Sequence, residues 1–495
     1  MTLVLVIAAA VGFAANAESF ISLTAQKQLF LDDYLIASMT NIERRIQPAE
    51  KYQGNPVVWA SEPWEPKLNV LYGSVVQDDG RYKMWYQAGM GVGYAESSDG
   101  IKWSKPPLDL VTIDGRKTNL LFLKREEFKG PEAFPTFWEL FGVHKDERDP
   151  DPARRYKMGF LSIVRPYAGP RPDPFHPTDR RGLGVAGSPD GIHWRLIDAW
   201  ATEAICDGAT HWMFEPSRKK YVLYGRTRKT LPEVEAAWSK YDWYEEYHSG
   251  RAVARVESPD FLSWDFREPA SAPVVMTADV NDPPGTEIYS MMVFPYESVY
   301  IGLVQVFHAT PETCYLDVQL AVSRDSLHFS RVADRAPFIP VGSVGSWDRF
   351  NHSLANNPPI PAGDELRFYY GGRTYRHTPY KGKDTGPKAG GIGLATIKKD
   401  RFVSLQASFD GGGILTKPLK LRGGDLHLNA KSDFGEIVVE VLDPAGNRIA
   451  KSKPMRSDKL DMVVDWESGS LKHLDAPVVL RFTLKNACLF AIWCT

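Results

Sequence analysis

A short strand-like run recurs five times before residue 405, and this repeat restricts the possible folds more than any other feature of the sequence. Each copy is rich in aromatic and large apolar side chains, and four of the five carry a tyrosine at the matching place. Self-similarity of this kind is typical of repeat architectures, in which each copy forms one structural unit. The copies are Tyr82–Tyr86, Tyr156–Phe160, Tyr221–Tyr224, Tyr300–Leu303 and Leu366–Tyr370.

A second run, rich in small residues, follows each copy, and a turn with a serine, an aspartate and an aromatic residue follows four of the five. Because Asp-Gly between strands is a strong hairpin signal, we expect these aspartates to cap turns rather than to catalyse. Each repeat then holds four antiparallel strands, which is a propeller blade, so five repeats predict a five-bladed β-propeller. The turns are Ser97–Trp103, Ser188–Trp194, Ser258–Trp264 and Ser323–Phe329.

The sequence changes character near residue 411, where short runs of alternating apolar and polar residues begin. Short alternating strands separated by turns predict a β-sandwich. We therefore expect an all-β chain, with a five-bladed β-propeller over residues 18–410 and a C-terminal β-sandwich over residues 411–495. The apolar segment Leu29–Ile36 precedes the first repeat. It could complete the last blade or pack on the sandwich.

The first 17 residues form a short apolar run that ends in Ala15-Asn16-Ala17. This pattern predicts a signal peptide and hence a secreted or periplasmic protein, and no other segment is apolar enough to predict a membrane span. The formal net charge is -2, and the sequence has no basic stripe, so we expect no nucleic-acid partner. The oligomeric state stays open.

Cysteine and glycine patterns give no reason to expect a metal or a cofactor. Four cysteines are too few for a disulfide framework in a chain of 495 residues, and no CxxC pair predicts a zinc site. Cys488 and Cys494 lie on one predicted strand, too far apart to bridge, whereas a Cys206–Cys314 bridge is possible. Gly89–Gly93 is not followed by a helical pattern, so it does not predict a nucleotide loop.

The repeat and the C-terminal strands resemble those of glycoside hydrolase family 32, and the propeller alone also resembles family 43. The chain is similar above all to exported bacterial propeller proteins of a family-32-like kind, and this resemblance implies activity on carbohydrate. The W-x-N-D-P and E-C motifs of family 32 are absent, and Arg148-Asp149-Pro150 lies in a polar stretch typical of a surface turn, so invertase-type chemistry is not implied. The matching motifs are Leu29–Asp33, Pro63–Glu65, Arg81–Tyr86, Thr286–Tyr289 and Asp317–Asp325.

Ligands of such propellers bind over the central axis, where the innermost strand of each blade begins. Cleavage of a glycosidic bond needs two carboxyl groups that face each other across it, one protonated and one ionised. We predict Asp207 and Glu287 as this pair, with Glu65 as a third catalytic carboxylate that holds sugar hydroxyls or tunes a pKa. Which of the pair is the acid stays open. Each repeat offers one acidic residue at the axis, namely Glu65, Glu132, Asp207, Glu287 and Asp348.

Other polar and aromatic side chains are candidates for binding the substrate, although each could equally be structural. Arg226 and Arg373 directly follow tyrosine-bearing strands and could bind an acidic sugar or a sulfate. Trp243 belongs to an aromatic cluster in the insertion 232–247, which shows the best helical pattern and could form a stacking wall. The predicted substrate-binding residues are His211, Tyr289, Asp348, His352, Arg226, Arg373, Glu132 and Trp243.

The sequence therefore predicts an exported glycoside hydrolase that acts on a poly- or oligosaccharide through acidic residues at the propeller axis. Three alternatives remain open. They are a non-catalytic glycan-binding propeller, a polysaccharide lyase and a structural or protein-binding propeller.

Overall fold

The computed structural model describes the chain as two compact units built almost entirely from β-strands, which confirms the predicted all-β class. Unit 1 comprises the described residues up to Glu43 together with Leu405–Thr495, and unit 2 comprises Arg44–Ser404. The predicted signal peptide 1–17, Glu132 and Cys206 lie outside the described residues. The described residues are 20–65, 69–89, 91–124, 133–134, 136–164, 180–203, 207, 209–264, 272–377, 389–471, 474 and 476–495.

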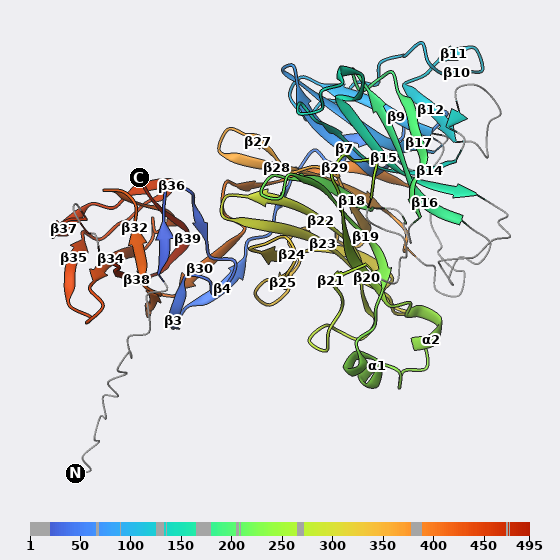
Figure 1. Ribbon diagram of the computed structural model, residues 1–495. Helices are drawn as coiled ribbons and strands as arrows, with labels where there is room; N and C mark the ends of the chain where they lie inside the picture. Colours follow the sequence, from blue (N-terminus) through green and yellow to red (C-terminus); the bar gives the residue numbers. More distant parts are fainter. Residues whose placement is uncertain are drawn as a thin grey trace. The chain divides into compact units, whose positions relative to one another are not determined.

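Unit 2 holds five sheets of mostly antiparallel strands that follow one another along the chain, one for each repeat (Figure 1). Sheet 1 consists of β7 (Asn69–Asp78), β8 (Arg81–Ala88), β9 (Gly91–Ser97), β12 (Leu120–Lys124) and β13 (Ala133–Phe134). Sheet 2 consists of β14 (Phe137–Lys145), β15 (Tyr156–Val164), β16 (Arg180–Ser188) and β17 (Arg195–Glu203). Sheet 3 consists of β18 (His211–Glu215), β19 (Lys220–Arg228), β20 (Arg251–Ser258) and β21 (Val274–Met276).

Sheets 4 and 5 complete unit 2, and sheet 5 is closed by strands that precede sheet 1 in the chain. Sheet 4 consists of β22 (Thr286–Tyr296), β23 (Val299–His308), β24 (Tyr315–Ser323) and β25 (Ser330–Arg331). Sheet 5 consists of β26 (Phe350–Leu354), β27 (Ile360–Ala362), β28 (Glu365–Arg373), β29 (Gly390–Lys398), β5 (Glu50–Lys51) and β6 (Val58–Trp59). Each sheet packs against the next, and β26 and β28 also pack against β7, so the five sheets form a closed, propeller-like ring.

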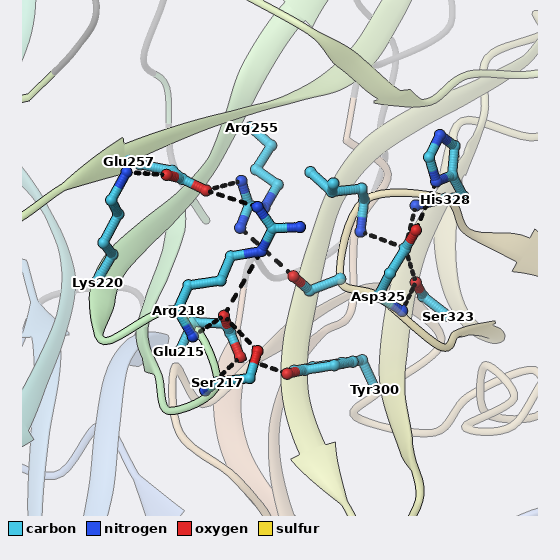
Figure 2. Close-up of polar contacts among 12 residues, drawn as sticks. Glu215, Ser217, Arg218, Lys220, Arg255, Glu257, Tyr300, Ser323, Asp325 and His328 are labelled. Carbon is cyan, nitrogen blue, oxygen red and sulfur yellow. Dashed lines mark hydrogen bonds and ion pairs between the residues drawn. The ribbon is translucent and has the colours of Figure 1, made fainter.

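The tyrosine of the repeat joins neighbouring sheets. Its hydroxyl donates a hydrogen bond to a carboxylate at the end of the first strand of the preceding sheet. Figure 2 shows one such contact, from Tyr300 of sheet 4 to Glu215 of sheet 3. Because each carboxylate is buried, the bond compensates its desolvation and fixes how adjacent sheets meet. The other two pairs are Tyr156 with Asp78 and Tyr221 with Asp146.

The aspartates of the repeated turns cap those turns, as the sequence predicts. In each turn one carboxylate oxygen accepts the backbone N–H groups two and three residues later, at 2.7–2.9 Å. The serine two residues earlier donates its hydroxyl to the same carboxylate, as Figure 2 shows for Ser323 and Asp325. These aspartates are structural residues. They are Asp99, Asp190, Asp260 and Asp325.

A buried polar network at the centre of the ring ties the sheets together. The side chain of Asn356, which follows β26, accepts a hydrogen bond from His211 of sheet 3 and donates to the Phe141 carbonyl of sheet 2 at 3.1 Å. The backbone of Asn356 bonds to Ser74 of sheet 1. His211 Nε2 also lies 2.6 Å from the Val293 carbonyl of sheet 4. Ser74, His211 and Asn356 thereby connect all five sheets.

Helices are few in the described part of the chain. The predicted insertion holds α1 (Pro232–Trp238) and α2 (Tyr244–Tyr247), and a single 3-10 turn spans Pro152–Arg154. No helix in the described residues is long and apolar enough to cross a membrane. A small hairpin is formed by β10 (Thr112–Ile113) and β11 (Arg116–Lys117).

Unit 1 consists of two sheets whose inner faces share one hydrophobic core, which includes Leu428, Ile492, Val439 and Phe482. The first sheet contains β2 (Gln28–Leu29), β33 (Leu426–Lys431), β36 (Asp458–Val463) and β39 (Ala487–Cys494). The second contains β3 (Ile36–Thr40), β31 (Gly412–Thr416), β34 (Glu436–Leu442), β35 (Arg448–Ser452), β37 (Trp466–Ser468) and β38 (Val479–Lys485). β1 (Ile21–Leu23) pairs with β32 (Leu419–Leu421), and β4 (Glu43–Ile46) and β30 (Val403–Ala407) carry the chain across the unit boundaries.

The unit boundaries differ from the predicted division at residues 18, 410 and 411. Residues before Arg44 belong with the C-terminal strands, because Leu23, Phe30 and Leu35 are buried in the core of unit 1. Of the two alternatives for Leu29–Ile36, packing with the C-terminal strands is the one that the structure shows, and β5 and β6 close sheet 5. The possible bridge between Cys206 and Cys314 stays a prediction, because Cys206 lies outside the described residues.

Candidate functional site

Charged and aromatic side chains gather at the end of unit 2 where the first strand of each sheet begins. In an antiparallel sheet the second strand ends and the third begins at this same edge. Thr286, which opens β22, is accordingly paired with His308, which ends β23. The sequence thus places at one end the residues that open β22 and β20 and those that close β19 and β28.

Asp207 lies just before sheet 3 and is held by Arg226, which lies near the end of β19. Arg226 Nη1 donates to Asp207 Oδ2 at 2.6 Å, and Arg181 Nη1 lies 3.5 Å from Asp207 Oδ1. The other side of the Arg226 guanidinium donates twice to the Tyr289 carbonyl, at 3.2 and 3.0 Å, and its Cζ lies 4.2 Å from the centre of the Tyr289 ring. The Asp207 side chain is 29% exposed, so a ligand can reach it.

Glu287 opens β22 and is fully buried. It accepts hydrogen bonds from Arg251 and from the Ser249 backbone N–H, and His248 Nδ1 lies 3.6 Å from its Oε1. Burial alone would raise the pKa of Glu287, but Arg251 and the Ser249 N–H outweigh it and hold the pKa below its usual value. Glu287 is therefore ionised at neutral pH.

Tyr289 stands between these two ion pairs. His377 Nε2 lies 3.3 Å from the Tyr289 hydroxyl, and Tyr72 of sheet 1 is also hydrogen-bonded to Tyr289. Burial, and then the charges of Arg373, Arg251 and Arg226, lower the pKa of His377 to about 3, so its ring is neutral. Burial, followed by the hydroxyl of Tyr289 and the charge of Glu139, raises the pKa of Tyr72 well above its ordinary value. All five sheets therefore contribute to one group of side chains.

Several predicted site residues have structural partners elsewhere. Glu65 is buried and accepts hydrogen bonds from Tyr86 at 2.6 Å and from Lys105 at 2.5 Å, both in or beside sheet 1. No contact among the described residues joins it to Asp207 or Glu287. Asp348 is buried and accepts from Lys51 at 2.6 Å and from Tyr370 at 3.0 Å.

Two further predicted residues lie near the axis or the insertion. His211 belongs to the central network, and its burial lowers its pKa to about 4. It lines a small cavity together with Tyr72 and Asn356, so it lies beneath the site rather than in it. Trp243 stacks on Tyr241 with ring centres 5.1 Å apart and lies against Gly285, two residues before Glu287. His352 lies in β26, but its side chain is outside the described part, as is Glu132.

The structure adds residues that the sequence prediction omits. Arg251 opens the small-residue strand β20, and Glu139 lies inside β14, seven residues after the predicted Glu132. His377 follows β28 by four residues. The repeat pattern could have identified Arg251, which opens its strand, and Glu139, which lies near the start of β14. Nothing in the sequence indicates His377.

The motif Arg148-Asp149-Pro150 is part of a structural ion-pair network. Lys157 Nζ lies 2.7 Å from Asp149 Oδ2, and Arg154 also pairs with Asp149. Over the described residues, no three His, Cys, Asp or Glu side chains are grouped so as to hold a metal ion.

No protein-family model matches the sequence, and no curated protein matches it. Among solved structures the chain is similar to a thermostable family-43 glycoside hydrolase, with 12% identity over 73% of this chain and 96% of that chain and a TM-score of 0.43. A glycosyl hydrolase from Bacteroides ovatus gives 15% identity, 72% and 95% coverage and a TM-score of 0.44.

A third similar structure is the GH32 β-fructofuranosidase of Bombyx mori, with 10% identity, 89% and 93% coverage and a TM-score of 0.40. The solved structures that the chain is similar to thus include members of families 43 and 32. Similarity at this level assigns no activity to this chain.

Proposed function

We propose that this protein is an exported glycoside hydrolase that cleaves a poly- or oligosaccharide at the group of side chains around Tyr289. We also propose that unit 2 is a five-bladed β-propeller, supported by its ring of five sheets, and that unit 1 is a β-sandwich. The observation that most supports the enzymatic proposal is that Asp207 and Glu287, from different repeats, are both held beside Tyr289 by arginines. Cleavage of a glycosidic bond uses a pair of carboxyl groups, and these two carboxylates belong to one group of side chains.

Asp207 and Glu287 are both ion-paired, which suits a base or a nucleophile better than a proton donor. Asp207 is the more exposed, so we assign it contact with the reacting water or sugar. Glu287 then orients Arg251 and sets the local charge. The proton donor must be a third group, and the candidate to test is Glu139, a carboxyl group that lies close to Tyr72.

The test is to screen the full chain against a panel of glycans, identify the products, and then compare Asp207→Asn and Glu139→Gln with the parent. Removing a catalytic base or acid lowers kcat by about 100- to 10,000-fold. Binding of the same oligosaccharide should be retained. The matched control is Asp114→Asn, at an exposed turn whose φ of 49° asparagine tolerates. Full turnover in Asp207→Asn would exclude the assigned role.

Glu287→Gln needs a separate readout, because it leaves the guanidinium of Arg251 without its ionised partner. Breaking such a buried pair costs about 3–5 kcal/mol of folding free energy. Its activity is therefore to be compared only after thermal unfolding has shown that the variant is folded at the assay temperature.

A polysaccharide lyase is the second candidate, and one contact favours it. The Tyr289 hydroxyl and the neutral His377 ring lie 3.3 Å apart beside three guanidinium groups. Elimination from an acidic sugar needs a base for the proton next to the carboxylate and a cation that neutralises that carboxylate. A product with a new carbon–carbon double bond, detected by its ultraviolet absorbance, would replace the hydrolase proposal with this one.

A further inference from the structure

The three arginines around Tyr289 come from different parts of unit 2. Arg226 lies near the end of β19, Arg251 opens β20 and Arg373 ends β28. Arg251 Cζ lies 5.9 Å from the centre of the Tyr289 ring and 5.3 Å from that of Phe307. The ring of His377 lies 5.3 Å from Tyr289 and 4.7 Å from Phe307. Arg226 and Arg251 thus pack on the buried ring of Tyr289, and Arg373 lies close enough to His377 to affect its charge.

The ion pairs with Asp207 and Glu287 do not cancel the positive charge of the arginines near His377. At the His377 ring, Arg373, Arg251 and Arg226 all act against protonation, and each acts more strongly than the opposing Asp207 carboxylate. Burial is the first cause of the low pKa of His377, about 3, and the three arginines lower that pKa further despite the nearby carboxylate. The site is electropositive, although the whole chain has a formal net charge of -2.

Arg251 also has donor capacity that no described residue uses. Its Nη1 donates to Glu287 and, at 2.7 Å, to the Ser249 hydroxyl, while its buried Nε–H has no hydrogen-bond partner. A buried guanidinium N–H without an acceptor is costly, so an oxygen supplied by a ligand would stabilise it. Guanidinium groups bind carboxylate and sulfate oxygens with paired, charge-assisted hydrogen bonds.

We infer, on the basis of the proposed function, that Arg226, Arg251 and Arg373 form a subsite for a sugar that carries an oxyanion, a carboxylate or a sulfate. The anionic group accepts from the partly exposed Arg251 and Arg373, while the buried Arg226, Tyr289 and Phe307 hold these groups in place and add charge. The substrate class is then an acidic glycan rather than a neutral one.

The experiment is calorimetric titration of the full chain with galactose oligomers of one length in three forms: neutral, oxidised to galacturonate, and sulfated. We expect at least one anionic form to bind about 10- to 100-fold more tightly than the neutral form, the range of one to two charge-assisted hydrogen bonds. The preference should shrink at high salt, because exposed charges are screened. The galacturonate and sulfate arms distinguish the two sources of the oxyanion.

Variants then connect the preference to these residues. Arg251→Gln should lose the preference for anionic oligomers. Arg251→Lys keeps the charge but not the paired N–H donors of the guanidinium, so it should retain part of the preference. Because loss of Arg251 also leaves Glu287 unpaired, Arg373→Gln is the second variant, and it should weaken anionic binding while neutral binding stays the same. The control is Arg218→Gln, a 39% exposed side chain beside Glu215 in Figure 2.

Equal binding of neutral and anionic oligomers, or an anionic preference that survives both Arg251→Gln and Arg373→Gln, would overturn the inference. Cleavage of neutral oligomers without any anionic preference would overturn it and leave the proposed function standing. Tight binding of an anionic oligomer without cleavage would support the inference and contradict the proposed hydrolase function. Absence of binding to every oligomer would overturn both.

Discussion

At the scale of single residues, the partner of a titratable group decides its role more than its type does. Glu65 and Glu287 are both buried glutamates near strand starts, so the sequence groups them. In the structure Glu65 is bound within sheet 1, whereas Glu287 faces an arginine of another sheet. Asp207, Arg226 and Tyr289 were predictable because they lie at repeat positions that face the axis. Their pairing was not, since it depends on side chains from separate repeats.

The buried histidines predict how stability changes with pH. Burial lowers the pKa of His144 to about 3 and that of His211 to about 4, below the 6.5 of an unfolded chain. At pH values between the folded and the unfolded pKa, the unfolded state binds more protons than the folded state. The free energy of unfolding therefore falls as the pH falls. Each histidine contributes up to about 1.4 kcal/mol per pH unit.

Urea unfolding at pH 7.5, 6.5 and 5.5 measures this slope directly. His211→Gln should lower stability at every pH and make the slope shallower by up to about 1.4 kcal/mol per unit. His377→Gln, outside the central network, should reduce the slope with less loss of stability. A slope that neither substitution alters would show that these histidines bind as many protons in the folded state as in the unfolded state.

At the scale of elements, the sheets were predictable and the closing strands were not. The repeated tyrosine and small-residue runs predict strands because their side chains fill the spaces between crowded sheets. β5 and β6 have two residues each and no sequence pattern of their own. They are strands only because their backbones pair with the edge of β29. Tertiary pairing, rather than local preference, produces such elements.

The repeated turn predicts a measurable contribution to stability. Asp190 Oδ1 accepts the N–H groups of Ile192 and His193, both at 2.8 Å. Asp190→Ala removes both bonds and should lower the free energy of unfolding by about 1–2 kcal/mol. Asp190→Asn keeps an acceptor oxygen and should cost less. Denaturant midpoints at unchanged m-value measure the difference, and equal losses in the two variants would contradict a capping role.

At the scale of the whole molecule, each unit joins residues that lie far apart in the sequence. Four buried residues from the N-terminal segment, Leu23, Phe30, Leu35 and Ile36, belong to the core of unit 1. The sequence left open whether Leu29–Ile36 belongs to the propeller or to the C-terminal strands, because a strand that pairs with distant residues carries no signal of its partner. The predicted boundary at residue 411 therefore cuts through a folding unit.

A fragment of residues 411–495 should show no cooperative thermal transition, because it lacks those core residues. Joining residues 20–43 to residues 405–495 through a flexible linker should restore the transition. In that joined chain Phe30→Ala should cost about 3–5 kcal/mol, the usual effect of deleting a buried phenyl ring. A cooperative transition in the 411–495 fragment alone would contradict the division of the chain described above.

The closure of sheet 5 by β5 and β6 has a consequence for biosynthesis. Glu50 and Val58 leave the ribosome early, yet their pairing partners in β29, Thr396 and Ile392, are made more than 300 residues later. A nascent chain can form the intervening sheets one by one but cannot seal the ring until nearly all of it has been translated. Contacts so distant in sequence slow folding. The sealing step is thus also a checkpoint, at which truncated chains retain an open edge that proteases and chaperones can recognise.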